Sequence, residues 1–202
     1  MRRILLISFI TLFAMRTLLA NETSALDINE NDFIIGDENA PITIIEYASM
    51  SCSHCASFHI NTLPEIKKEY IDTGKVRMIF RDYPFNYPAL MGSMMMRCIP
   101  NNVRYDYMNA LYLLQPDWVN RDPSISKKEL YKIMQSGGMT KEEFDACYKD
   151  IDIENEILEG VMAAQKDLNI KSTPSFIVNG NLIEGNKNIK EFRQIIDKIL
   201  SE

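Results

Sequence analysis

The chain has 202 residues, of which 46% are hydrophobic and 25% are charged, and its formal net charge is −6 at pH 7. These proportions exclude a disordered chain, a collagen-like repeat and a small disulfide-held scaffold, and the length suits one domain or one domain with a large insertion. Four cysteines are too few to staple a fold of this size, so the role of each cysteine pair has to be considered separately.

The first twenty residues have the pattern of a secretory signal peptide. Two arginines follow the initial methionine and precede an apolar run, Ile4–Met15, and the small Ala20 leads into polar residues. The run is shorter than the roughly 18–20 residues of a membrane-spanning helix. Arg16 interrupts the pattern, which leaves an uncleaved N-terminal membrane anchor as the alternative. We therefore expect residues 1–20 to direct export to the periplasm, an oxidising compartment in which disulfides persist.

The charge of the exported chain argues against nucleic acid as a partner. Residues 1–20 contain three arginines and no acidic residue, so their removal leaves 19 basic and 28 acidic residues, a net charge of −9. A chain this acidic is poorly suited to binding phosphate backbones or anionic lipid headgroups.

The segment after residue 32 predicts a βαβ unit. Three runs have the composition of strands: Phe33–Gly36, Ile42–Ala48 and Val76–Tyr83. Glu46 is the one charge in the second run and is anomalous in a buried strand. Ser51 is placed to cap a helix that begins at Cys52, and Pro64 predicts a kink or break in that helix. The strand–helix–strand order predicts that the second and third runs are parallel.

Residues 89–170 have helical periodicity and predict an all-helical insertion. One helix face carries Met91, Met94, Met95 and Cys98. Four later stretches are also helical in pattern: residues 105–114, 126–135, 140–149 and 154–169. Two pairs have capping-box spacing: Ser126 with Glu129, and Thr140 with Glu143. The methionines could suit Cu(I), but a stripe at helical spacing is more often a core or an adaptable surface.

Strand signals return near the C-terminus. Residues 174–178 predict a strand, Asn179-Gly180 is a strong hairpin signal, and residues 182–185 predict the returning strand. Ile189–Leu200 predicts a final amphipathic helix. The layout is therefore an α/β fold in which a helical block separates βαβ and ββα halves.

The chemistry is concentrated in Cys52-Ser53-His54-Cys55, at the expected start of a helix. Unpaired N–H groups and the positive end of the helix dipole favour an anion there, and the His54 imidazole can add a hydrogen bond or positive charge. Cysteines in such motifs have pKa values of about 3.5–7.5. A stabilised thiolate favours the reduced form, which makes the disulfide more oxidising by about 30 mV per pKa unit. The motif therefore predicts a dithiol oxidant.

A structural disulfide and a zinc site are the two alternatives for this motif. A disulfide ring this small at a helix start is strained and easily reduced, which disfavours a purely structural role. The motif would supply only half of a zinc site, which needs a second ligand pair. The chain has no second CxxC and no HxxxH, and His59 is the only other histidine. We therefore expect no metal.

Three segments together resemble the DsbA-like thiol–disulfide oxidoreductases: Pro41–Ser49, Cys52–Cys55 and Thr173–Gly180. The resemblance covers about Phe33 to Leu200 and implies a thioredoxin fold with an inserted all-helical domain. The thioredoxin domain would comprise residues 33–88 and 171–202, with the insertion at 89–170. We expect a monomer, and no bound cofactor, because the cysteine pair itself carries the two electrons. Such a protein oxidises reduced or unfolded exported proteins, and a quinone-linked membrane oxidase resets it.

The resemblance also assigns roles to individual residues. Cys52 is the exposed nucleophile and Cys55 the buried resolving cysteine. Thr173-Pro174 matches a cis-proline dipeptide that lies beside the cysteines and offers backbone groups to a substrate peptide. Glu46 matches a buried acid that helps to move a proton to or from Cys55. From the residues alone, the alternative is a Glu46 carboxylate that reaches water at the strand end.

Cys98 and Cys147 lie in the helical block among apolar neighbours. In an exported protein we expect them to pair, and some alphaproteobacterial-type DsbA proteins resemble this chain in having a second disulfide in the helical domain. Two buried free thiols are the alternative.

Two positions depart from the family pattern. Ser53 stands where proline is common, and threonine before the cis-proline, as at Thr173, is also found in disulfide isomerases. A reductase or isomerase of the same fold is therefore the first alternative. A non-catalytic peptide- or metal-binding thioredoxin-like module is the second.

Overall fold

The computed structural model describes residues 26–202. The signal peptide or membrane anchor predicted for residues 1–20 lies outside this range. Within it, none of the helices combines the length and apolar character needed to cross a membrane.

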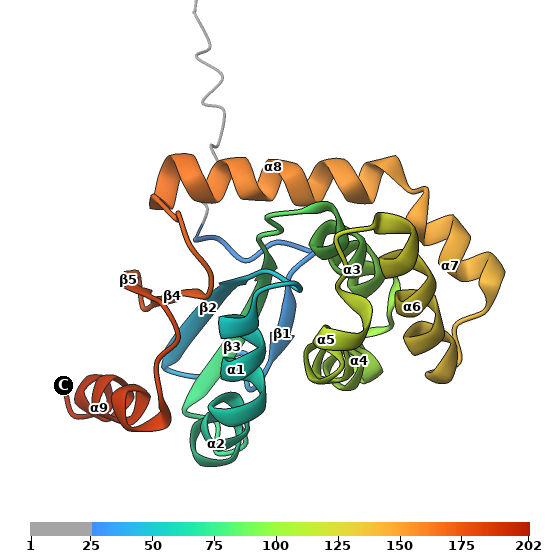
Figure 1. The fold of residues 1–202 in the computed structure, drawn as a ribbon. Helices are drawn as coiled ribbons and strands as arrows, with labels where there is room; N and C mark the ends of the chain where they lie inside the picture. Colours follow the sequence, from blue (N-terminus) through green and yellow to red (C-terminus); the bar gives the residue numbers. More distant parts are fainter. Residues whose placement is uncertain (1–25) are drawn as a thin grey trace, which may run out of the picture.

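A mixed five-stranded sheet forms the centre of the fold (Figure 1), in the order β1-β3-β2-β4-β5. The strands are β1 (Phe33–Ile35), β2 (Ile42–Ala48), β3 (Val76–Asp82), β4 (Ser175–Val178) and β5 (Asn181–Glu184). β2 and β3 are parallel, as the βαβ pattern predicts, and the other three neighbouring pairs are antiparallel. β2 therefore lies between β3 and β4, so its C-terminal end meets the start of β4.

One face of the sheet is covered by four helical segments: α1 (Ser53–Asn61), α2 (Leu63–Ile66), the π-helical turn η1 (Lys67–Ile71) and α9 (Ile189–Leu200). The predicted break near Pro64 is present, since α1 ends at Asn61 and the proline occupies the first turn of α2. Ile42 and Ile44 point from β2 into this layer and are fully buried. Because side chains alternate along a strand, Glu46 points to the same face.

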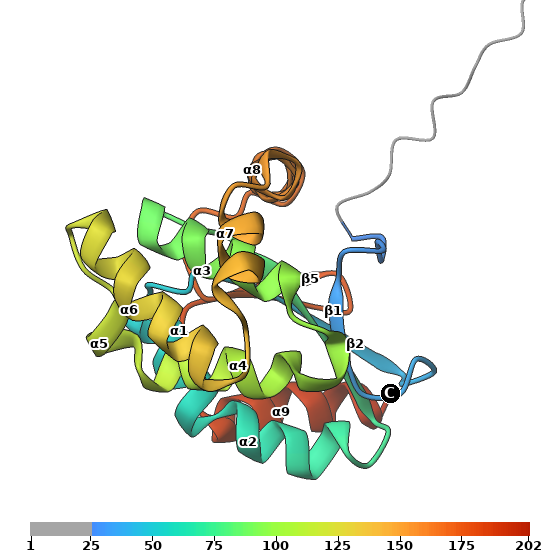
Figure 2. The ribbon, with the colours of Figure 1, turned by 90° about the vertical axis from the view of Figure 1, so that its right-hand side faces the viewer.

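The other helices come between β3 and β4: α3 (Tyr87–Cys98), α4 (Asn101–Leu113), α5 (Gln115–Trp118), α6 (Pro123–Ser136), α7 (Lys141–Tyr148) and α8 (Ile151–Leu168). The long helix α8 extends from α7 back over the sheet, on the face opposite α2 and α9 (Figures 1 and 2). Ala164 of α8 packs there against Ile45 and Ile177. The predicted thioredoxin fold with inserted helices is therefore confirmed.

The methionines of α3 belong to the hydrophobic core. Met91, Met94 and Met95 are buried together with Trp118 and Phe144. Their thioethers are thus used in packing, as expected for a stripe at helical spacing.

Two predicted helix caps differ from the structure. Ser51 does not cap α1, because the N-cap position is Cys52, which makes no side-chain capping bond. Ser126 lies inside α6, which begins three residues earlier and is capped by Asp122. The Thr140–Glu143 capping box is present at the start of α7.

Candidate active site

The two cysteines of the CxxC motif lie at the start of α1, directly beyond the end of β2. Cys52 is the N-cap residue and is half-buried, whereas Cys55 is one turn further along and fully buried. Both are free thiols in the structure. The first cysteine is therefore accessible to another thiol, and the second is shielded by the core.

The Thr173–Pro174 segment lies against Cys52. Tyr47 of β2 pairs with Ser175 of β4, so the residues before β4 meet the loop after β2. The Thr173–Pro174 peptide bond is cis, and the carbonyl oxygen of Thr173 lies 3.4 Å from Sγ of Cys52. The predicted substrate-binding dipeptide is thus beside the reactive sulfur.

The environment of Cys52 favours its thiolate. The pKa of Cys52 is lowered to about 5, chiefly by a hydrogen bond from the Cys55 side chain. A hydrogen bond from Thr173 and the backbone N–H groups of Cys55 and His54 lower it further, while burial acts in the opposite direction. The N-terminus of α1 therefore stabilises the Cys52 thiolate through the backbone N–H groups of His54 and Cys55.

The environment of Cys55, in contrast, disfavours its thiolate. Burial strongly raises the pKa of its thiol, and the hydrogen bond to Cys52 and the negative charge of Glu46 raise it further. At neutral pH the pair therefore consists of one thiolate, Cys52, and one thiol, Cys55.

Ser53 and His54 are both exposed between the two cysteines. His54 was expected to assist the Cys52 thiolate through its imidazole. In the structure its contribution to the Cys52 pKa comes from the backbone N–H.

Glu46 is completely buried in β2, so the alternative in which its carboxylate reaches water is wrong. Its Oε2 atom is 2.9 Å from Nε2 of His59, a buried residue of α1. The His59 ring stacks on Tyr112 of α4, with 4.1 Å between ring centroids. A hydrogen-bonded acid–imidazole pair therefore lies in the core near the cysteines.

Two residues in this region had no predicted role in the sequence. His59 is four residues after Cys55, and this spacing is the sequence signal that places both residues on one face of a helix. Gln115 of α5 donates from Nε2 to the backbone carbonyls of Met50 (2.9 Å) and Cys52 (3.1 Å). No local pattern marks this contact, because it joins elements more than 60 residues apart in sequence.

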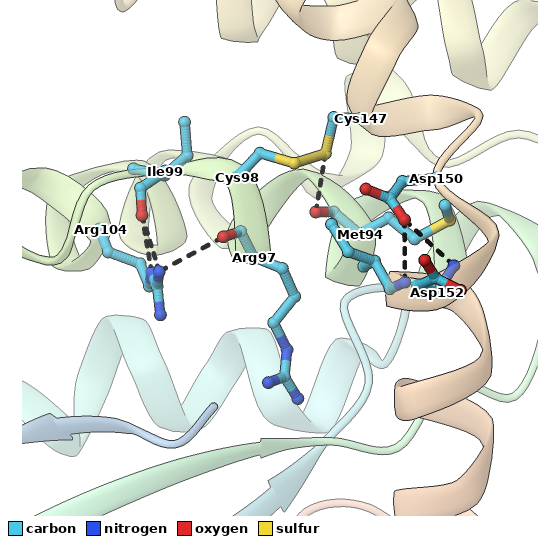
Figure 3. Close-up of a disulfide and its surroundings, with 9 residues drawn as sticks. Met94, Arg97, Cys98, Ile99, Arg104, Cys147, Asp150 and Asp152 are labelled. Carbon is cyan, nitrogen blue, oxygen red and sulfur yellow. Dashed lines mark hydrogen bonds between the residues drawn. A yellow bond between two sulfur atoms is a disulfide. The ribbon is translucent and has the colours of Figure 1, made fainter. Parts of the chain in front are cut away.

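Cys98 at the end of α3 and Cys147 in α7 form a disulfide, with 6.2 Å between their Cα atoms (Figure 3). Sγ of Cys147 lies 3.1 Å from the carbonyl oxygen of Met94. A disulfide sulfur carries no proton, so this is a close contact and not a hydrogen bond. Arg97 of α3 and Arg104 of α4 lie away from the disulfide, and Arg104 donates to the carbonyl of Ile99 (Figure 3).

No cluster of three or more histidine, cysteine, aspartate or glutamate residues suited to a metal ion occurs within the described range, residues 26–202. The free, half-buried Cys52 beside the buried Cys55 supports sulfur exchange at Cys52, with Cys55 as the second sulfur.

Comparison with known proteins gives consistent matches. The thioredoxin family (Thioredoxin_4) matches residues 28–198. A Rickettsia bellii sequence named "Putative protein-disulfide oxidoreductase" is 34% identical over 87% of this chain and 67% of its own length. The crystal structure of Wolbachia pipientis alpha-DsbA1 superposes with a TM-score of 0.82 at 32% identity, over 89% of this chain and 96% of that chain.

A more distant structure, BdbD from Bacillus subtilis, shares the fold with a TM-score of 0.72 and 22% identity, over 85% of this chain and 94% of that chain. The chain spans only 62–67% of the length of the Rickettsia relatives. The motifs, the fold and these matches agree: the chain belongs to the thioredoxin family and, within it, to the DsbA-like thiol:disulfide oxidoreductases.

Proposed function

We propose that this chain is an exported dithiol oxidant that introduces disulfide bonds into reduced secreted or periplasmic proteins at Cys52 and Cys55. The observation that carries the proposal is the pKa of Cys52, which is lowered to about 5 beside a buried Cys55 thiol. A stabilised thiolate favours the reduced protein, so the disulfide gives up its oxidising equivalents readily.

The difference in burial between the two cysteines supports Cys52 as the sulfur that a substrate attacks. A substrate thiolate reaches the half-buried Cys52, forms a sulfur–sulfur bond with its Sγ atom and breaks the bond to Cys55. A second substrate thiolate then attacks the substrate sulfur of this mixed disulfide. Cys52 departs as a thiolate, and its low pKa makes it a good leaving group. The products are an oxidised substrate and a reduced Cys52–Cys55 pair.

Thr173, Pro174 and Glu46 complete the proposed site. The Thr173 carbonyl, 3.4 Å from the Cys52 sulfur, is placed to accept a hydrogen bond from the backbone of a bound peptide. Glu46 acts on the buried Cys55 as a proton-transfer group, a role supported by its complete burial and by its electrostatic effect on the Cys55 thiol.

The cycle needs an electron acceptor, because each turnover leaves two electrons on the cysteine pair. We propose a quinone-linked membrane oxidase in this role and a monomeric enzyme without a bound cofactor. The Cys98–Cys147 disulfide supports an oxidising compartment, since such bonds are rare in the cytosol.

The reduction potential of the Cys52–Cys55 pair, measured against glutathione, tests the oxidant function. We expect a value well above the roughly −270 mV of thioredoxin, and a value near or below it would contradict the proposal. The oxidised protein should also form disulfides in a reduced, unfolded ribonuclease, and Cys52→Ser should abolish this activity. Preferential reshuffling of a scrambled ribonuclease would instead identify an isomerase.

A further inference from the structure

The first exchange step leaves a proton to be accounted for. When the Cys52–Cys55 bond breaks, its electron pair stays on Cys55, in a buried position where the thiolate is strongly disfavoured. The sulfur must therefore gain a proton as it departs. Cys55 is inaccessible to solvent, so that proton has to come through the protein.

Glu46 and His59 are the buried polar pair in a position to supply it. Their side chains share a hydrogen bond of 2.9 Å, and their side-chain exposures are 0% and 1%. Within residues 26–202, the remaining polar atoms, Oε1 of Glu46 and Nδ1 of His59, are buried without a hydrogen-bond partner. Buried polar atoms are rarely left in this way, so the arrangement calls for a role beyond packing.

The pair acts on Cys55 through the charge of Glu46, and all three side chains are buried. The Glu46 carboxylate is close enough for its charge to act on the Cys55 thiol. His59 lies one helical turn beyond Cys55 on α1, so both residues are on the helix face that meets the core.

His59 also connects the pair to a cavity. This cavity has a volume of about 30 Å³ and is lined by His59, Tyr112 and Phe80, but not by Glu46. A water molecule needs roughly 10–15 Å³, so the space is sufficient for one. Its wall also contains the exposed Asn31 and the half-buried Arg97, so the cavity extends from His59 towards the protein surface.

We propose that His59 passes protons between Glu46 and this cavity, so that the pair supplies and removes the proton of the buried Cys55. This inference rests on the thiol–disulfide exchange proposed above. It adds His59 as a positioning residue and a route by which protons travel between the cavity and Glu46. As Cys55 departs with the electron pair, the proton shared by Glu46 and His59 is the source of the proton that its sulfur gains. A proton from water in the cavity then restores the pair. When Cys55 attacks, the proton moves in the opposite direction.

Several ionisable groups surround this route and shape its pH dependence. They come from four of the elements around the pair: Cys55 on α1, Arg81 and Asp82 on β3, Arg97 on α3, and Arg104 and Tyr112 on α4. The strand β4, which pairs with β2 at Glu46, carries no ionisable side chain.

The closure of a mixed disulfide isolates the proposed step. Reduced protein mixed with oxidised glutathione first forms a Cys52–glutathione disulfide, and Cys55 then attacks it in a concentration-independent phase. In the wild type we expect this phase to depend weakly on pH near neutrality, because the proton leaves through the pair. In His59→Gln, which keeps a hydrogen-bonding amide but cannot exchange protons in the same way, it should slow about tenfold or more. Its rate should then rise with pH.

Two controls separate this role from a structural one. Ser93→Ala, on α3, removes a buried hydroxyl that also lacks a hydrogen-bond partner among the described residues, and it should leave the closure phase unchanged. The pH profile of Cys52 alkylation should also stay the same in His59→Gln. If His59→Gln does not fold, Glu46→Gln is the second variant and should show the same slow, pH-dependent closure.

Closure at the wild-type rate and pH dependence in folded His59→Gln or Glu46→Gln would overturn the inference. Equal slowing in Ser93→Ala would also overturn it, because the effect would then be general. The outcome of this test can be told apart from a failure of the proposed function. If the protein does not oxidise ribonuclease but its closure depends on His59, the proton-transfer role of His59 stands and the oxidant function is wrong.

Discussion

Cys52 and Cys55 are three residues apart and chemically identical in sequence, yet the structure gives them opposite acidities. The difference arises from position along the first turn of α1, where Cys52 meets free N–H groups and Cys55 enters the core. The motif and its placement at a helix start predict the thiolate. The buried pairing of Glu46 with His59 could not be predicted, because it depends on the packing of α1 on β2.

The acidity of Cys52 has a consequence for stability that can be measured. Its pKa is about 5 in the folded protein and about 8.5 in an unfolded chain. The thiolate therefore stabilises the reduced fold fully above about pH 8.5, and this contribution is lost as the pH falls through about 5. The difference in unfolding free energy between reduced wild type and reduced Cys52→Ser should grow over this range. Burial, the main cause of the raised pKa of Cys55, is present in both folded proteins, so Cys55 stays protonated in both over this range. A flat difference would contradict the assignment.

Thr173 offers a second test at a single residue. Its side chain is buried, and a hydrogen bond from it helps to lower the pKa of Cys52, as expected if the hydroxyl turns to donate to the thiolate. Thr173→Val keeps the shape and the backbone carbonyl, so the pKa of Cys52 should rise above about 5 in thiolate absorbance titrations. Thr43→Val makes the same substitution near the opposite end of β2, where the hydroxyl accepts from Arg77, and should leave the titration unchanged.

At the scale of elements, the short helix α5 connects the inserted helices to the active-site loop. Gln115 binds two backbone carbonyls, those of Met50 and Cys52, with one amide group. These two bonds fix the position of the loop after β2 relative to the start of α1. They therefore also fix the backbone N–H groups that face the Cys52 sulfur. The insertion therefore helps to shape the thiolate site although it contributes neither cysteine.

Gln115→Leu should loosen this loop. The variant removes two hydrogen bonds and leaves buried carbonyls less well satisfied, which costs about 1–3 kcal/mol in unfolding free energy. The pKa of Cys52 should rise as the backbone donors lose their alignment. Chemical denaturation and thiolate titration measure the two effects. Gln165→Leu, on the exposed surface of α8, serves as control, and an equal loss in both variants would argue against the role of Gln115.

The order and type of the elements could largely be predicted from sequence, whereas some helix starts could not. Thr140 and Glu143 form a capping box because their spacing places both next to free N–H groups. Ser126 and Glu129 have the same spacing, but Pro123 and Asp122 start α6 one turn earlier. Short spacing motifs recur by chance, and only the neighbouring residues decide which one begins the helix.

At the scale of the whole molecule, the Cys98–Cys147 disulfide links α3 to α7 across 49 residues of sequence. It restricts the unfolded chain in the region that packs against the active site. It lies apart from the exchange chemistry, because its sulfurs are in the helical core beside Met94.

Replacing both of these cysteines should therefore affect stability more than exchange. The double variant Cys98→Ala/Cys147→Ala should lose up to about 4 kcal/mol of unfolding free energy, by the chain-entropy argument for a loop of this length. Alkylation of Cys52 should keep the wild-type pH profile, because none of the groups that lower its pKa is altered. A change in that profile would show that the helical core controls the thiolate directly.

The two edges of the sheet have a consequence for a protein that handles unfolded chains. The edge strands β1 and β5 are only three and four residues long, and β5 carries the exposed Glu184. Short edge strands, and a charge on one of them, discourage an extended polypeptide from adding itself as a further strand. A client chain would thus be held through its sulfur and a brief contact near Thr173, and could leave once oxidised instead of remaining attached as a seed for aggregation.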